Sequence, residues 1–263
     1  MSAEKTTTTA TRIWGLHGPT ITLDLGELVV GGSGEITIPV PSFVIEHPRG
    51  IVLFDTGFTP EAFGDPMSVY SLLVDVVTIR ITESQLLVNQ LEAIGFSPTQ
   101  VTHVVVSHAH QDHTGGLFLF PDAKFYIGAG DLQYAFWPNA SDEGIIRRPD
   151  LEKTRGFAWH QVPGDLDLFG DGSVVILDMP GHTPGNKSLL VRLPDRTMIL
   201  AGDTVHVRSA LETGMPTPYD YSSKDARLSI ERLVMLRDAH DAEVWVNHDP
   251  ADGEHFGFAA GAE

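Results

Sequence analysis

Short apolar runs, separated by polar stretches rich in Gly, Pro, Asn and Asp, recur along most of the chain. Runs of this kind are typical of β-strands. They occupy residues 21–25, 36–38, 43–46, 51–55, 102–106, 174–177, 198–201 and 244–246. Two other segments show helical spacing instead. We predict a helix over 84–94, whose apolar positions are Leu87, Leu91 and Ile94, and another over 223–238, whose stripe is Ala226, Ile230, Leu233 and Val234.

Four potential metal ligands follow the apolar run at 102–106 directly. They occupy six positions and are His108, His110, Asp112 and His113. Neutral imidazole is the commonest ligand for zinc and related metals. The first two histidines can face one ion while Asp112 and His113 face a second, so the cluster predicts a two-ion site. A solvated histidine-rich loop is the alternative, and it fits poorly with a cluster at a strand end.

Three further strand-like runs each lead into a ligand-type side chain, namely His182, Asp203 and His248. Loops at strand ends are where a rigid framework presents functional side chains. We therefore expect all seven residues to converge at one edge of a sheet. One ion is assigned to His108, His110 and His182. The other is assigned to Asp112, His113 and His248. Asp203 bridges the two, and each ion keeps an open position for water or substrate.

These motifs resemble the metallo-β-lactamase superfamily. Its His-x-His-x-Asp-His signature matches residues 108–113, the later ligands follow in the same order, and Asp55-Thr56-Gly57 matches the end of an earlier strand. The resemblance covers nearly all of residues 12–250. It implies an α/β chain with the metallo-β-lactamase fold, a four-layer αβ/βα sandwich, and a supporting role for Asp55 behind the ligands. We expect a disordered tail over 1–11 and a single hydrolase domain over 12–263.

Within the superfamily the chain is most similar to the N-acyl-homoserine lactonases, the quorum-quenching enzymes. Residues 38–45, 180–190 and 248–249 carry this similarity, much of which is shared by lactonases that open pyridoxolactone. The resemblance implies attack of a metal-bridging hydroxide on the lactone carbonyl, with Asp112 relaying a proton. Zinc is the first expectation for both divalent ions, although Fe, Mn and Co also suit mixed His and Asp ligands.

Two positions depart from the lactonase pattern. The lactonases usually carry a Tyr three residues after the bridging Asp, where this chain has His206. An imidazole N–H can still donate to a developing oxyanion, so His206 joins Asp112 as a candidate catalytic residue. Gln111 stands where some lactonases have an apolar residue. Both departures leave the metal ligands intact and concern the choice of substrate.

Composition narrows the functional classes. The chain has no cysteine, which excludes disulfides and thiolate ligands and disfavours the β-lactamase branch with a Cys ligand. Its net charge of −18 disfavours nucleases such as ribonuclease Z, which need a basic surface for phosphates, so no nucleic-acid partner is expected. The N-terminus lacks a secretory apolar core and no apolar stretch is long enough to span a membrane. We therefore expect a cytoplasmic protein without a membrane partner.

Two apolar segments have an open role. Residues 58–83 and 132–160 are equally consistent with core packing and with a surface that binds an acyl chain or a second copy of the chain, and in related lactonases the first helps to form both of these surfaces. A homodimer is consistent with this. The remaining histidines are expected to lie on the surface or in the scaffold. They are His17, His47, His103, His160, His240 and His255.

Other functions fit the same ligands. A dimetal site also hydrolyses other lactones, esters and organophosphates. A thioesterase of the glyoxalase II type is disfavoured, since those enzymes carry a basic helical C-terminal extension and only 15 residues follow His248. A metal-retaining binding or sensor protein is a third class. The small-molecule lactone nevertheless remains the expected substrate.

Overall fold

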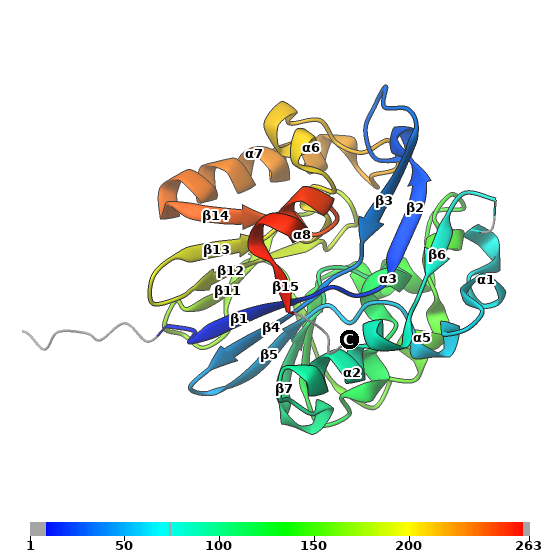
Figure 1. Cartoon of the computed structure of the whole chain (residues 1–263). Helices are drawn as coiled ribbons and strands as arrows, with labels where there is room; N and C mark the ends of the chain where they lie inside the picture. Colours follow the sequence, from blue (N-terminus) through cyan, green and yellow to red (C-terminus); the bar gives the residue numbers. More distant parts are fainter. Residues whose placement is uncertain (1–8, 74, 260–263) are drawn as a thin grey trace, which may run out of the picture.

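The computed structural model describes residues 9–73 and 75–259, and its strands form three sheets (Figure 1). The seven-stranded sheet has the order β15 (Phe258–Ala259), β1 (Arg12–Leu16), β4 (Ser42–His47), β5 (Gly50–Phe54), β7 (Val101–Val105), β8 (Lys124–Gly128) and β9 (Ala158–Val162). The five-stranded sheet has the order β10 (Leu166–Asp167), β11 (Val174–Asp178), β12 (Lys187–Arg192), β13 (Thr197–Leu200) and β14 (Ala242–Trp245). The third contains β3 (Glu35–Pro39), β2 (Thr20–Asp24) and β6 (Thr78–Arg80).

The two larger sheets pack face to face and are covered by helices on their outer sides. Apolar side chains of both sheets, including Phe43, Phe54 and Leu200, fill the space between them. The outer face of the seven-stranded sheet packs against α2 (Leu87–Ala93) and α4 (Asp131–Phe136). The other outer face packs against α6 (Arg208–Thr213) and α7 (Ser223–His240), which Figure 1 shows running along the sheet. This confirms the predicted four-layer αβ/βα sandwich.

Four further helices of the described chain lie in the loops. They are α1 (Pro66–Val69), α3 (Gln111–Thr114), α5 (Arg148–Glu152) and α8 (Pro250–Phe256). In the third sheet, β2 pairs with both β3 and β6, and Figure 1 shows this sheet beside the two larger ones, near α1. Its position matters because its strands flank the cavity described below.

The predicted strands are all present, shifted at their ends by one or two residues. The predicted helix at 223–238 is confirmed and continues to His240. The helix predicted over 84–94 is only partly correct, because residues 83–85 form a 3-10 turn and Leu86 is extended, so α2 begins at Leu87. The Gln85 side chain accepts a hydrogen bond from the Thr82 N–H, and this local bond holds the turn apart from the helix.

The predicted N-terminal tail spans residues 1–11, of which residues 1–8 lie outside the described residues. Ala10 is fully buried and its N–H donates to the Arg192 carbonyl, while the Thr11 N–H donates to the Glu46 carbonyl. Ala10 and Thr11 therefore belong to the folded part of the chain. Within the described part of the chain, no helix combines the length and apolar character needed to cross a bilayer.

The two apolar segments, residues 58–83 and 132–160, each place some side chains in the core and others on the surface. Phe58 and Tyr70 are buried in a small cluster with Val40, Ala62 and Ile79, whereas Leu72 is 72% exposed. In the second segment Tyr134 is buried and Trp137 is 87% exposed. Core packing is thus confirmed for part of each segment.

Candidate metal centre

The seven predicted ligands converge at one end of the two large sheets. Each comes from the segment after a strand: β7 is followed by the four clustered ligands, β11 by His182, β13 by Asp203 and β14 by His248. Strands that end at one edge deliver their loops to one place. All seven side chains are buried except that of Asp112, which is 18% exposed. The predicted convergence is confirmed.

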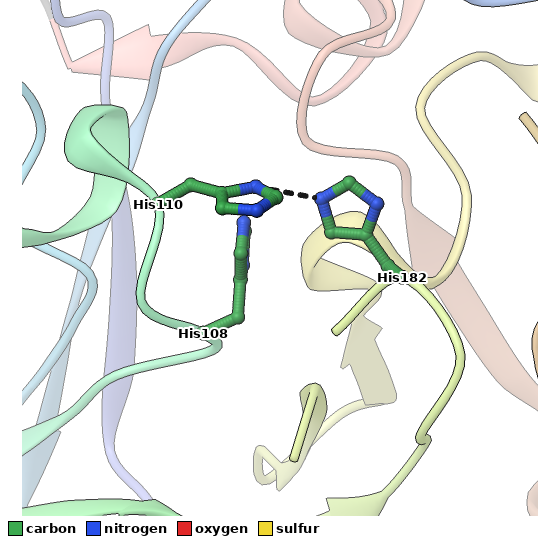
Figure 2. A group of neighbouring side chains, drawn as sticks. All are labelled: His108, His110 and His182. Atoms are coloured by element: carbon green, nitrogen blue, oxygen red, sulfur yellow. Dashed lines mark hydrogen bonds between the residues drawn. The ribbon is translucent and has the colours of Figure 1, made fainter. Parts of the chain in front are cut away.

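Three histidines form the first group (Figure 2). The His182 Nε2 atom lies 3.0 Å from His110 Nδ1. The three ring centroids are 4.4–4.7 Å apart, and each pair of rings is nearly perpendicular. Figure 2 shows His108 and His110 on one loop facing His182 on another. One nitrogen of each ring lies within 4.8 Å of the others, so the three offer a common binding point.

The second group contains Asp112, His113 and His248. The Asp112 Oδ2 atom lies 3.5 Å from His113 Nε2 and 3.9 Å from His248 Nε2. These three residues also offer ligand atoms within 4.8 Å of one another. Asp112 and His113 are on α3, whereas His248 follows β14, so this group also joins both sheets.

Asp203 lies between the two groups and turns one oxygen toward each. Its Oδ2 atom is 3.8 Å from His108 Nε2 and 3.5 Å from His182 Nε2. Its Oδ1 atom is 3.5 Å from His113 Nε2 and 3.2 Å from His248 Nε2. This is the arrangement a bridging carboxylate requires, and it agrees with the assignment made from the sequence.

The donor set fits a pair of divalent cations. Two ligand atoms about 2.0–2.1 Å from one tetrahedral zinc lie about 3.3 Å apart, and the separations above run from 3.0 to 3.9 Å. Among the described residues, Nε2 of His108, Nε2 of His113 and Oδ1 of Asp203 are buried without a hydrogen-bond partner. Buried polar atoms normally have partners, so these atoms fit the donor set of a bound cation.

The protonation states also suit metal binding. Burial lowers the pKa of His108 and of His110 well below the usual value, so both imidazoles are neutral. Burial opposes ionisation of Asp203, yet the facing histidines, His248 first, hold its pKa well below the usual value. Burial lowers the pKa of His113, but Asp203 and Asp112 outweigh it and raise that pKa. A bound cation would take the place of that proton.

Asp55 supports the second group, as the resemblance implied. One of its oxygens lies 2.8 Å from His113 Nδ1, and the other accepts a hydrogen bond from the Ser107 N–H at 2.7 Å. Asp55 has a φ of 62°, which Asp tolerates better than most residues. A carboxylate on the far nitrogen of a ligating histidine fixes the ring and its tautomer.

Sequence reasoning missed the partners of the other ligands. The His182 Nδ1 atom is 3.0 Å from the Asp220 carboxylate, and His248 Nδ1 donates to the Pro39 carbonyl at 2.7 Å. His110 Nε2 lies 3.3 Å from the Tyr134 hydroxyl, which donates to Asp142. These partners come from four separate segments, and no local pattern marks them.

The sequence also gave no sign of Asp131, a buried carboxyl that joins two ligand loops. It accepts hydrogen bonds from the Ala109 N–H at 2.9 Å and from the Gly185 N–H at 2.7 Å. Ala109 lies between His108 and His110 in the sequence, and Gly185 follows His182. Burial raises the pKa of Asp131 to about 6. Asp131 lies at the start of α4, shortly after β8. This position after a strand was the only feature of the sequence that could have identified it.

The two residues that depart from the lactonase pattern are both buried. His206 Nε2 is 3.0 Å from Asp203 Oδ2, and its ring is stacked on that of His248 with the centroids 5.7 Å apart. The Gln111 side chain donates to the Gly144 carbonyl at 3.1 Å, and Gln111 lines the cavity described below. His206 therefore contacts the bridging carboxylate, while Gln111 contacts a neighbouring loop.

A cavity of about 860 Å³ opens over the ligand groups. Its floor includes His182, Asp203 and His248. One wall is formed by apolar side chains of the third sheet, Ile21, Leu23 and Ile38. A second apolar part of the lining follows β5 and leads into β6 of the third sheet, namely Phe58, Leu72, Leu73, Val76 and Val77. The segment 139–145 also lines it. The cavity thus joins a metal-binding floor to apolar walls.

The other histidines lie outside the ligand groups found among the described residues. His103 stacks on Tyr126 with ring centroids 6.0 Å apart, and burial lowers its pKa to about 4. His47 stacks on Phe169 at 3.9 Å. Both side chains contribute to packing, as expected from their distance from the motifs.

This chain is similar to known proteins. Residues 37–240 match the model of the metallo-beta-lactamase superfamily. The N-acyl homoserine lactonase AttM of Rhizobium radiobacter is 35% identical over 225 residues, which cover 84% of this chain and 85% of that protein.

Solved structures show the same fold. An N-acyl homoserine lactone hydrolase with N-hexanoyl-L-homoserine at its catalytic metal centre has a TM-score of 0.84 at 20% identity, over 95% of this chain and 98% of that one. The dizinc quorum-quenching lactonase AidC has a TM-score of 0.72 at 17% identity, over 92% and 89%. With its matched motifs, converging ligands and shared fold, this chain belongs to the metallo-β-lactamase superfamily, in the family of the N-acyl homoserine lactonases.

Proposed function

We propose that this chain opens the lactone ring of N-acyl-homoserine lactones with two divalent cations, of which zinc is our first choice. One observation carries the proposal: an apolar-walled cavity ends directly on a seven-ligand centre. The names of the relatives support the substrate class, and the dizinc neighbour supports zinc and a count of two.

The cavity suits a substrate that is polar at one end and apolar at the other. A lactone ring and its amide need polar groups, whereas each buried CH₂ of an acyl chain gains about 0.8 kcal/mol. The floor of the cavity is polar and two parts of its lining are apolar. We therefore place the lactone at the ligands and the acyl chain against the apolar side chains of the lining.

When bound, the cation pair supplies a Lewis acid and a nucleophile at neutral pH. The chain itself orients the reaction. Asp203 turns one oxygen to each ligand group and so sets their spacing. Asp112 is the more accessible of the two ligand carboxylates, at 18% against 4%. It is therefore our candidate to move a proton during ring opening, as predicted from the sequence.

The test is metal analysis joined to an acid-release assay. Ring opening produces a carboxylic acid, so pH-indicator kinetics with butanoyl- to decanoyl-homoserine lactone report turnover directly. A thioester and an aryl ester serve as comparison substrates. We expect two metals per chain and the highest kcat/KM on the lactones. Two metals with faster turnover of the thioester or the aryl ester would overturn the substrate assignment while leaving the metal centre intact.

Three further expectations stay predictions. They are the homodimer, the cytoplasmic location and the direct action of His206 on the substrate. Size-exclusion chromatography with light scattering tests the first of these.

A further inference from the structure

The reaction proposed above needs a hydrogen-bond donor at the lactone carbonyl, and the position that supplies a Tyr in related lactonases holds His206 here. The His206 side chain is only 3% exposed, and its Nε2 atom is 3.0 Å from Asp203 Oδ2. Its ring also stacks on His248. His206 lines the cavity, but its Nε2 atom already faces the bridging carboxylate.

Tyr219 lies above His206 and faces the cavity. Its ring packs edge-on against His206 and His182, with centroid distances of 5.6 and 5.7 Å. It is 37% exposed and forms part of the cavity lining beside Asp203 and His248. Within the described part of the chain, its hydroxyl has no hydrogen-bond partner among the side-chain bonds. Tyr219 therefore lines the same cavity as the candidate ligands at its floor.

The segment that carries Tyr219 is fixed to the metal centre. Asp220 accepts a hydrogen bond from the Thr217 N–H at 2.8 Å through one oxygen and contacts His182 Nδ1 at 3.0 Å through the other. The Tyr221 N–H donates to the His182 carbonyl at 3.2 Å. Pro216 and Pro218 restrict φ on either side of Thr217. The Tyr219 side chain is thus held in place relative to a metal ligand.

We propose that Tyr219 is a catalytic residue whose phenolic O–H donates a hydrogen bond to the lactone carbonyl oxygen. This inference rests on the proposed function. In the reaction, a water oxygen bonds to the carbonyl carbon, the ring C–O bond breaks, and the products are a carboxylic acid and an alcohol. The phenol keeps its proton throughout and stabilises the negative charge that develops on the carbonyl oxygen.

His206 then acts as a positioning residue. Its Nε2 atom, 3.0 Å from Asp203 Oδ2, limits the positions open to the carboxylate that turns one oxygen to each ligand group. His206→Gln is expected to weaken metal retention, and excess metal should restore kcat to within a few-fold of the wild type. A donor to the substrate would behave differently, because excess metal cannot restore a missing hydrogen bond.

The experiment compares Tyr219→Phe with Tyr126→Phe in the metal-loaded full chain. Tyr126 is on β8, it is not among the residues that line the cavity, and its ring stacks on His160 with the centroids 5.0 Å apart. Each substitution removes only a hydroxyl. We expect Tyr219→Phe to lower kcat about 10- to 100-fold, below or at the lower end of the effect of losing an oxyanion donor, while kcat of Tyr126→Phe stays within about twofold of the wild type.

The acyl-chain length of the substrate distinguishes a hydrogen-bond donor to the carbonyl from a residue that only contacts the acyl chain. The carbonyl is common to all substrates, so the loss in Tyr219→Phe should be equal for butanoyl- and decanoyl-homoserine lactone, at full metal content and unchanged Tm. Wild-type kcat in Tyr219→Phe, or a loss that grows with chain length, would overturn the inference. So would a loss confined to His206→Gln at full metal content. Absence of lactone turnover in the wild type would instead refute the proposed function.

Discussion

The two ends of the cavity are built differently. At the floor, the rings of His113, His182 and His248 each have a carboxylate or carbonyl on the nitrogen that faces away from the metal position. At the mouth, Leu72 is 72% and Val76 51% exposed. Side chains held by several contacts keep one geometry, whereas exposed apolar side chains can change with little loss of stability. The comparison indicates that the chemistry is fixed at the floor and the substrate range is set at the mouth.

Asp203→Asn should have the largest effect. It removes the charge that faces both ligand groups, so we expect less than one tightly held metal per chain. Activity should fall by more than the roughly 100-fold that the loss of a ligand's hydrogen-bond partner costs. Elemental analysis and lactone kinetics measure both. The control is Asp238→Asn, an exposed carboxylate on α7. Two retained metals with full activity would rule out the bridging role.

Asp55→Asn tests whether metal binding at the floor depends on the groups that hydrogen-bond to the ligand histidines. Asn tolerates the φ of 62° at this position, so the change removes the charge behind His113 with little backbone strain. We expect metal affinity to fall about 10- to 100-fold, measured by competition with a chelator. Unchanged affinity would show that the ring of His113 is oriented without Asp55.

Leu72→Ser tests the mouth. An exposed leucine that gains contacts only with a long acyl chain should affect long substrates alone. We expect kcat/KM for decanoyl-homoserine lactone to fall about three- to tenfold, up to the value of burying one leucine, with butanoyl-homoserine lactone and Tm unchanged. Leu228→Ser on α7 is the matched control, since that leucine is 53% exposed. An equal loss on both substrates would contradict the assignment of this wall.

Gln111→Leu probes the link between the two ends. Its side chain joins α3 at the floor to Gly144 in the segment that lines the cavity. Loss of one hydrogen bond of about 0.5 kcal/mol should raise KM about two- to threefold and leave kcat and metal content unchanged. A fall in metal content would contradict the contrast between floor and mouth, because residues at the mouth would then help to hold the metal ligands.

The sequence predicted the floor better than the mouth. Each candidate ligand follows an apolar run, and strand ends in a layered fold lie together, so a local pattern was enough to find all seven. The hydrogen-bond partners of these ligands could not be found in this way. Asp220 and Tyr134 reach His182 and His110 from segments whose position depends on the packing of the whole chain. No spacing rule connects residues 110 and 134.

The same limit applies to secondary structure. The apolar spacing of Leu87, Leu91 and Ile94 predicted a helix, but the start of that helix was decided by the Gln85 side chain and the Thr82 N–H. Tyr219 was missed for a similar reason. It lies among prolines without a helical or strand pattern, and only the contact of Asp220 with His182 brings it to the floor.

The third sheet has one consequence for how this family diversifies. Ile38 lines the cavity, and the carbonyl of the next residue, Pro39, holds His248. A substitution at Ile38 that shifts the strand would therefore also shift the Pro39 carbonyl and the ring of His248. In the other apolar part of the lining, the described hydrogen bonds include none from Leu72 or Leu73 to a ligand residue. New acyl-chain preferences should accordingly arise by mutation on the Leu72 side, while the Ile38 side drifts slowly under selection for an intact catalytic floor.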